Sequence, residues 1–126
     1  VGATLQNAAR LHATGVRVGF TLANSEPYYV RKLREAAGVA VAHGLPWDAA
    51  LAAITRVPAE AFGVADRVGV LETGRPADLV LWSGDPLEVT TWPEQVWIAG
   101  RLQPERSRQT ELRDRYLEKL RRGEAR

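Results

Sequence analysis

The residues best suited to chemistry lie in one short stretch, residues 22–29 (LANSEPYY). It contains an amide, a carboxylate and two phenols, from Asn24, Glu26, Tyr28 and Tyr29. The stretch directly follows a predicted strand, and α/β folds place binding groups on the loops that leave the ends of strands. Asn24 and the two tyrosines are therefore candidate substrate contacts, although packing at the start of the next helix accounts equally well for the tyrosines.

The other chemically capable side chains do not form a recognisable motif. The two histidines, His12 and His43, lie in separate predicted helices, and histidine metal sites need ligands that converge. The carboxylates Asp78 and Asp85 stand at the ends of a predicted strand and turn, where such groups usually accept hydrogen bonds from nearby backbone amides. No glycine-rich phosphate loop and no serine in a nucleophile-elbow context is present.

Hydrophobic periodicity predicts the elements that position these groups. Apolar stripes predict helices, and short β-branched or apolar runs bounded by turn residues predict strands. The predicted helices are Thr4–Thr14, Val30–His43, Pro46–Ile54, Pro58–Phe62 and a long one from Pro104 to about Arg122, and the predicted strands are Val16–Thr21, Leu79–Trp82 and a hairpin of 96–98 with 101–102. The order helix, glycine, strand at the start is typical of an α/β unit.

Two glycine positions predict local packing. Gly38 lies inside a predicted helix, where glycine costs about 1 kcal/mol relative to alanine, so a close contact is expected there. Ala99-Gly100 joins the two hairpin strands in a tight turn, although alanine suits a positive φ less well than asparagine or aspartate. The apolar stripe of the last helix, Leu112, Tyr116 and Leu120 with Leu117 beside it, must pack against the body or another chain.

Composition is that of an ordinary soluble protein and leaves the compartment open. The chain has 126 residues, 45% of them hydrophobic and 25% charged, and no cysteine, so disulfides are excluded. Residues 101–126 hold nine basic and five acidic side chains (+4), which leaves eight and ten (−2) for residues 1–100. The tail's acids are interleaved with its bases, so we expect a solvated helix and no nucleic-acid partner. No membrane span is expected either.

Four segments in order resemble one known family, between about Leu5 and Arg101. They are GLPW at 44–47, Thr55 with PA at 58–59 and FG at 62–63, VG at 68–69 with LETG at 71–74, and ADLV at 77–80 running to GDPL at 84–87. Together they resemble the C-terminal portion of the amidohydrolase superfamily, in particular imidazolonepropionase-like metal-dependent hydrolases. The resemblance implies the last strand and closing helices of a TIM-type (β/α)8 barrel, then the C-terminal half of a small β-sandwich.

The same resemblance divides the chain into three segments and implies that the rest of the barrel is supplied from elsewhere. Residues 1–63 would be the C-terminal piece of the barrel, residues 64–103 the second half of the sandwich, and residues 104–126 a charged amphipathic helix. The chain begins Val1-Gly2-Ala3-Thr4 without a start methionine, and the first half of the family fold is absent, so we expect a piece of a longer protein. The strand Val16–Thr21 would lose both barrel neighbours, so we expect the remainder of the barrel, a complementary chain or another copy of this chain to cover it.

At the catalytic position the chain departs from the family. Aligning VRVGFTLAN with the family pattern places Ala23 where an aspartate binds metal and accepts a proton from water. Alanine does neither. Two explanations remain: the parent is a degenerate relative, which we favour, or the loop is shifted and Glu26 takes the role. Asn24 remains a weak candidate as a neutral ligand.

The implied function follows from this gap. The family hydrolyses C–N bonds outside peptides, in cyclic amides or similar substrates, with a divalent metal, most often zinc. This chain lacks the family's histidine ligands, so we expect it to bind no metal alone and to be inactive as an isolated chain. The alternative is a non-catalytic, degenerate relative that serves assembly or binding. A third hypothesis, that Arg101–Arg126 binds an anionic partner, rests on the tail's charge alone.

Overall fold

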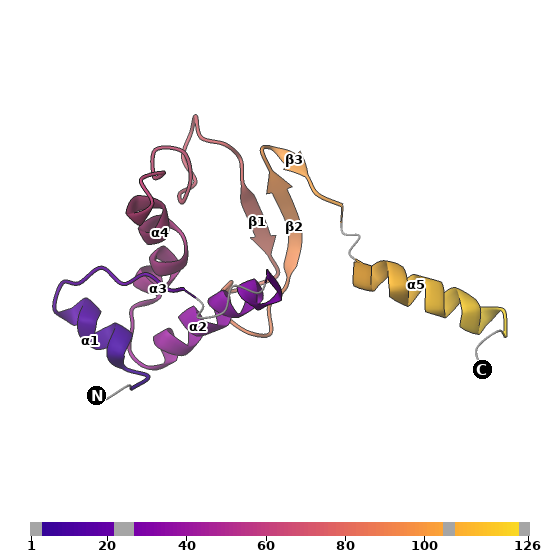
Figure 1. Cartoon of the computed structure of the whole chain (residues 1–126), viewed down its shortest axis with the longest axis horizontal. Helices are drawn as coiled ribbons and strands as arrows, with labels where there is room; N and C mark the ends of the chain where they lie inside the picture. The colour runs from indigo at the N-terminus through magenta and orange to yellow at the C-terminus, as the bar shows by residue number, and fades with distance from the viewer. Residues whose placement is uncertain (1–3, 22–26, 105–107, 124–126) are drawn as a thin grey trace.

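The computed structural model describes residues 4–21, 27–104 and 108–123, and it forms a small α/β structure. Within these residues the helices come first and a three-stranded antiparallel sheet follows (Figure 1). The helices are α1 (Asn7–Ala13), the 3-10 helix η1 (Pro27–Val30), α2 (Arg31–Ala42), α3 (Trp47–Ile54) and α4 (Arg56–Ala61). The strands β1 (Leu79–Trp82), β2 (Pro93–Ile98) and β3 (Arg101–Leu102) precede a last helix, α5 (Arg108–Arg121).

The core lies where α2 and α3 cross, and most of its side chains are small. Its buried members are Ala37, Ala40, Leu45, Ala50 and Leu87. Alanines let two helix backbones approach closely, so the helices pack with little side-chain volume between them. Ala8 and Ala9 bring α1 onto the same cluster, and Phe20 packs against it from the stretch that follows α1.

The sheet is a simple meander in the order β1-β2-β3. Leu79 lies opposite Trp97 and Val80 opposite Val96, while Trp97 also lies opposite Leu102 on the other side. The turn between β2 and β3 has positive φ at both central residues, 49° at Ala99 and 75° at Gly100. This confirms the predicted tight hairpin, and its geometry matches the right-handed twist of the strands.

The predicted strand at Val16–Thr21 was wrong. The structure assigns no strand to these residues, and the amide of Phe20 donates instead to the carbonyl of Ala53, at 3.0 Å. A strand exists only where a neighbouring strand pairs with it, and none of the described residues lies alongside this stretch as a strand. The alternation of side chains is a property of the stretch itself, whereas strand pairing depends on residues that are distant in the chain.

Most helix boundaries differ from the predictions by a few residues. Pro27–Val30, expected to belong mostly to a loop, forms the 3-10 helix η1 directly before α2. α4 begins at Arg56 rather than Pro58, because a proline is tolerated anywhere in the first turn, where its missing N–H has no intrahelical partner. α5 begins at Arg108 rather than Pro104, which lies outside the helix.

Helix α5 stands apart from α1–α4 and from the sheet (Figure 1). Three of its apolar side chains, Tyr116, Leu117 and Leu120, are exposed. The expectation that this stripe packs against something therefore stays a prediction. No helix among the described residues is both long enough and apolar enough to cross a membrane.

Candidate functional site

The predicted site loop is only partly covered by the structure. Ala23, Asn24 and Glu26 lie outside the described residues, so their roles stay predictions. Tyr28 belongs to η1, but its side chain also lies outside the described part. Tyr29 is half-buried, and the ammonium of Lys32 lies 4.8 Å from the centre of its ring. This cation–π contact supports the packing interpretation of Tyr29 and leaves its proposed substrate contact untested.

The two histidines lie on different helices and do not meet. His43 caps the C-terminal end of α2, and its Nδ1 lies 2.8 Å from the carbonyl oxygen of Val39, one turn earlier. His12 is exposed on α1. Within residues 4–21, 27–104 and 108–123, no three His, Cys, Asp or Glu side chains group closely enough to hold a metal. The described donor set therefore does not fit the divalent metal that the family implies.

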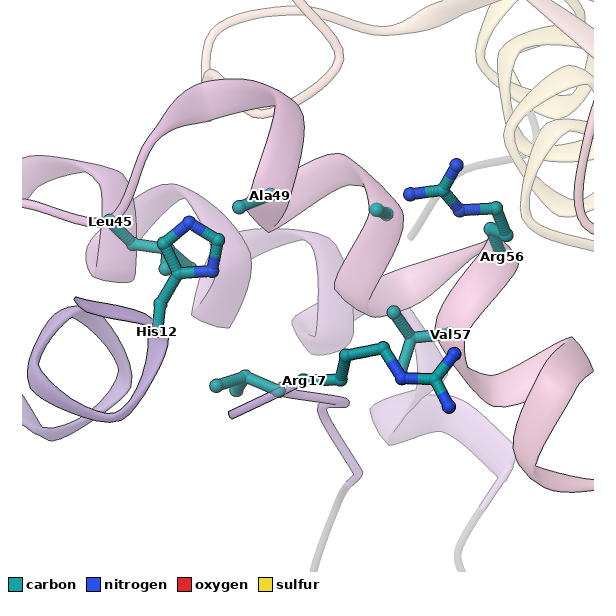
Figure 2. A pocket seen from close by; sticks show the side chains of 8 residues that line it. His12, Arg17, Leu45, Ala49, Arg56 and Val57 are labelled. Atoms are coloured by element: carbon teal, nitrogen blue, oxygen red, sulfur yellow. The ribbon is translucent and has the colours of Figure 1, made fainter. Parts of the chain in front are cut away.

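A small pocket opens beside His12 (Figure 2). Its volume is about 90 Å³, below the roughly 300–1,000 Å³ typical of ligand sites. Apolar side chains, Leu45, Ala49 and Val57 among them, form much of its lining. Figure 2 shows the His12 ring directed toward Leu45 and Ala49, whereas the guanidinium groups of Arg17 and Arg56 lie at the other side.

The pocket's two arginines are already paired with one carboxylate. Arg17 Nη1 donates to Glu60 Oε2 at 2.5 Å, and Arg56 Nε lies 3.7 Å from Glu60 Oε1. The Arg17 side chain is 75% exposed, so this pair contributes little to stability. Glu60 offsets part of the positive charge that an anionic ligand would need.

The carboxylates Asp78 and Asp85 bond backbone amides, as predicted. Asp78 Oδ1 accepts the N–H of Ala99 at 2.6 Å and so holds the strained hairpin turn beside it. Asp85 Oδ1 accepts the N–H of Leu87 at 2.8 Å. Asp85 also accepts the indole N–H of Trp47, with distances of 3.0 and 2.9 Å to its two oxygens.

Asp85 begins the 85–91 loop, which lies between β1 and β2 in the chain and packs against the helices. Its Leu87 is buried among the side chains of α2 and α3. Directly beneath it lies Gly38, where an added Cβ would come within 2.2 Å of the Leu87 carbonyl oxygen. The close contact expected at Gly38 is thus confirmed, and the contacting atom belongs to a loop 49 residues along the chain, at Leu87.

Arg34, one turn before Gly38 on α2, also holds the 85–91 loop in place. Its guanidinium donates to the carbonyls of Pro86 at 2.9 Å, Glu88 at 2.5 Å and Thr91 at 3.4 Å. Its Nη1 also donates to Thr91 Oγ1 at 3.2 Å. The guanidinium carbon lies 5.0 Å from the centre of the Trp82 ring on β1. A planar group with five donors is well suited to gathering several carbonyls in this way.

Sequence reasoning missed Arg34. An arginine on an amphipathic helix has the same pattern whether it faces solvent or a loop, so no sequence signal distinguished it. Gly38 was the available signal, because its cost inside a helix implied a close neighbour. We call the 85–91 loop, which includes Leu87, together with Arg34 of α2 the junction between helices and sheet.

Comparison with known proteins places the chain in a family. The model of the "Amidohydrolase family" matches residues 1–103. The chain belongs to the amidohydrolase family. A solved amidohydrolase from Thermotoga maritima MSB8 superimposes with a TM-score of 0.73 at 30% sequence identity, covering 82% of this chain and 27% of that one. The resemblance to amidohydrolases found in the sequence is thereby confirmed.

Two curated relatives of this amidohydrolase chain are similar over shorter stretches. The amidohydrolase tasK of Hapsidospora irregularis is 48% identical over 61 residues, which are 48% of this chain and 6% of that protein. The imidazolonepropionase of Acidiphilium cryptum is 35% identical over 89 residues, which are 68% of this chain and 22% of the enzyme. The chain thus spans about a quarter or less of the length of these relatives.

Proposed function

We propose that this chain supplies the C-terminal part of a metal-dependent hydrolase that acts on C–N bonds outside peptides, in a cyclic amide or a similar substrate. The observation that carries the proposal is the family match over residues 1–103, together with the similarity to an imidazolonepropionase. In this proposal residues 1–63 complete a TIM-type barrel and residues 64–103 complete a small β-sandwich.

We further propose that the chain hydrolyses nothing alone. In intact enzymes of this class a bound divalent metal, zinc in our proposal, lowers the pKa of a water and polarises the scissile bond. Support comes from the separate positions of His12 and His43 and from the lack of a three-ligand group in the described residues. The remainder of the barrel would have to bring the metal ligands.

The chain's own contribution in this proposal is positioning. Helix α2 follows directly on the candidate loop through η1, and Arg34 and Gly38 fix α2 against the 85–91 loop. The junction therefore sets where the start of α2 lies relative to the sheet. Tyr29, in η1, is the candidate substrate contact whose side chain the structure describes.

A chimera tests this proposal. The segment of the Acidiphilium cryptum imidazolonepropionase that this chain matches, 22% of that enzyme, is replaced by the matching residues of this chain. We expect a folded, metal-loaded protein with little turnover, because Ala23 can neither bind metal nor accept a proton. Restoring the carboxylate with Ala23→Asp should raise turnover by about 10²–10⁴-fold, the usual contribution of a general base.

Glu26 and the isolated chain provide the controls. Glu26→Gln added to the Ala23→Asp chimera should leave turnover unchanged, whereas abolished activity would show that Glu26 acts as the base and that our alignment of Ala23 is wrong. The 126-residue chain with added zinc should give no hydrolysis of the same substrate. Turnover by the isolated chain would overturn the proposed dependence on the rest of the barrel. A chimera that folds and binds metal but stays inactive with Ala23→Asp would favour the non-catalytic alternative.

A further inference from the structure

Helix α5 carries an apolar stripe that lies beyond the part of the chain matched by the family. The family match ends at residue 103, and α5 begins at Arg108. Three side chains of the stripe, Tyr116, Leu117 and Leu120, are 61%, 44% and 60% exposed. Figure 1 shows the helix apart from α1–α4 and from the sheet. The missing barrel and sandwich parts therefore give no reason to expect a cover for this stripe.

The acidic side chains of α5 lie on the side of the helix opposite the stripe. Spacings of three and four residues place them on one face: Glu111, Asp114 and Glu118. An α-helix turns once in about 3.6 residues, so two positions amount to just over half a turn. Asp114 is two positions from both Leu112 and Tyr116. Glu118 is likewise two positions from both Tyr116 and Leu120. The acids therefore point away from whatever covers the stripe.

Basic side chains flank the stripe on both sides. Arg115 and Lys119 directly precede Tyr116 and Leu120, whereas Arg121 directly follows Leu120. One position is a little over a quarter of a turn, so these bases border the stripe. The ammonium of Lys119 lies 5.9 Å from the centre of the Tyr116 ring, beside the stripe and not on the acidic face. The total charge of the tail did not select a partner, but this arrangement of charges does.

The basic borders disfavour a second copy of α5 as the cover. Two stripes packed against each other would bring a basic border of one helix against a basic border of the other, in the parallel and the antiparallel orientation alike. Like charges placed together in this way repel and weaken the pair. A matching surface must instead be apolar beneath the stripe and negatively charged along both of its borders.

We propose that α5 binds to the surface of a membrane that contains anionic phospholipids. The stripe enters the boundary between headgroups and acyl chains, the flanking bases contact the negative headgroups, and the acids face water. The long stems of arginine and lysine let their charges reach the headgroups while their carbons stay beside the stripe. Tyr116 suits this boundary, because its ring is apolar and its hydroxyl is polar.

A lipid surface fits better than an acidic groove on another protein. It presents negative charge along both borders of the helix without requiring carboxylates matched to each base. The helix would lie on the membrane, since none of the helices in the described part of the chain is suited to crossing one. This proposal does not depend on the proposed hydrolase function.

Flotation of the full 126-residue chain with lipid vesicles tests the proposal. One set of vesicles contains phosphatidylcholine with about one third phosphatidylserine, and the other contains phosphatidylcholine alone. The chain should float with the anionic vesicles and stay at the bottom of the gradient with the neutral ones, as aggregated protein also would. Raising the salt from about 0.1 M to about 1 M should weaken the binding, because the Debye length falls from about 10 Å to about 3 Å.

Two pairs of substitutions separate the position of the charges from their total. Arg115→Gln with Lys119→Gln should weaken binding to anionic vesicles roughly 30-fold, which is roughly fivefold for each base near the surface. Glutamine has a helix propensity close to those of arginine and lysine, so α5 stays helical. Arg10→Gln with Arg67→Gln is the matched control, because both residues are exposed and the net charge changes equally. This control should leave binding unchanged.

A fluorescent label tests which side of α5 meets the bilayer. The chain has no cysteine, so a single introduced cysteine can carry a polarity-sensitive dye without background. The emission from Tyr116→Cys, in the stripe, should shift to the blue when anionic vesicles are added. The emission from Glu111→Cys, on the acidic face, should not shift.

Several outcomes would overturn the proposal. Equal flotation with neutral vesicles, or equal loss of binding in the two charge pairs, would show that the flanking bases do not direct the binding. A label at position 116 that is shielded in buffer and does not respond to vesicles would show that the chain itself covers the stripe. Binding to duplex RNA or to an acidic protein, with no flotation, would show that the bases serve another class of partner.

Discussion

Replacing Gly38 by alanine tests the junction most sharply. The added methyl would lie 2.2 Å from the Leu87 carbonyl oxygen, whereas real Cβ atoms essentially never come closer than 3.0 Å to another heavy atom. Helix α2 and the 85–91 loop must therefore separate by about 1 Å, since both contacting parts are backbone or close to it. Arg34 bonds Pro86, Glu88 and Thr91 across the same gap, so the separation stretches these hydrogen bonds too.

Two opposing terms decide the sign of the change in stability. Alanine favours a helix over glycine by about 1 kcal/mol. Overpacking costs about 1–3 kcal/mol, and a lost hydrogen bond from a charged donor costs about 1.5–3 kcal/mol. We expect Gly38→Ala to lower the free energy of unfolding by about 2 kcal/mol net, although glycine-to-alanine changes in exposed helices are ordinarily stabilising.

Urea unfolding followed by tryptophan fluorescence measures this effect. Trp47 and Trp82 both contact the junction, so their emission reports its state. With a slope of about 1–3 kcal/mol per molar urea, the midpoint should fall by about 1 M. Val39→Ala, the neighbouring exposed position on α2, is the control and should change stability by no more than about 0.5 kcal/mol. All variants are compared at one protein concentration, because association would shift the apparent stability. A midpoint for Gly38→Ala at or above that of the wild type would refute the reasoning.

Two further changes probe single contacts. Arg34→Lys keeps the charge but loses the planar fork that reaches several carbonyls and stacks on Trp82, so we expect a loss of about 1–2 kcal/mol in the same urea titration, and an unchanged midpoint would show that the fork is dispensable. Ala99→Asn places a residue that tolerates the left-handed region at φ 49°, so thermal unfolding should show a gain of about 0.5–1 kcal/mol, and a lower melting temperature would contradict the strain assigned to Ala99.

Elements with local causes could be predicted from the sequence. The strand Leu79–Trp82 has the predicted bounds because turn residues flank a short apolar run, and the hairpin at Ala99-Gly100 follows from two strand-like runs two residues apart. The stretch Val16–Thr21 has an equally strand-like pattern. It failed because a strand also requires a partner, and partners are supplied by distant chain.

The candidate site shows the same division. Asp78 and Asp85 were predicted to bond backbone amides, and the N–H groups that donate to them lie next to turns that the sequence marks. Arg34 was missed, because the carbonyls that it binds lie 52 to 57 residues away along the chain. The roles of Ala23, Asn24 and Glu26 stay predictions, since these residues lie outside the described part.

The junction has a consequence for how the chain holds together. The sheet meets the helices through Leu87, Arg34 and the Trp47–Asp85 hydrogen bond, all of them non-covalent, and none involves residues 64–78, which connect α4 to β1. That connecting segment makes further contacts of its own, since Gly69 lies against Ala59 and Asp78 accepts the N–H of Ala99. A single proteolytic cut within residues 64–78 should therefore leave two fragments that stay associated and elute together in size exclusion.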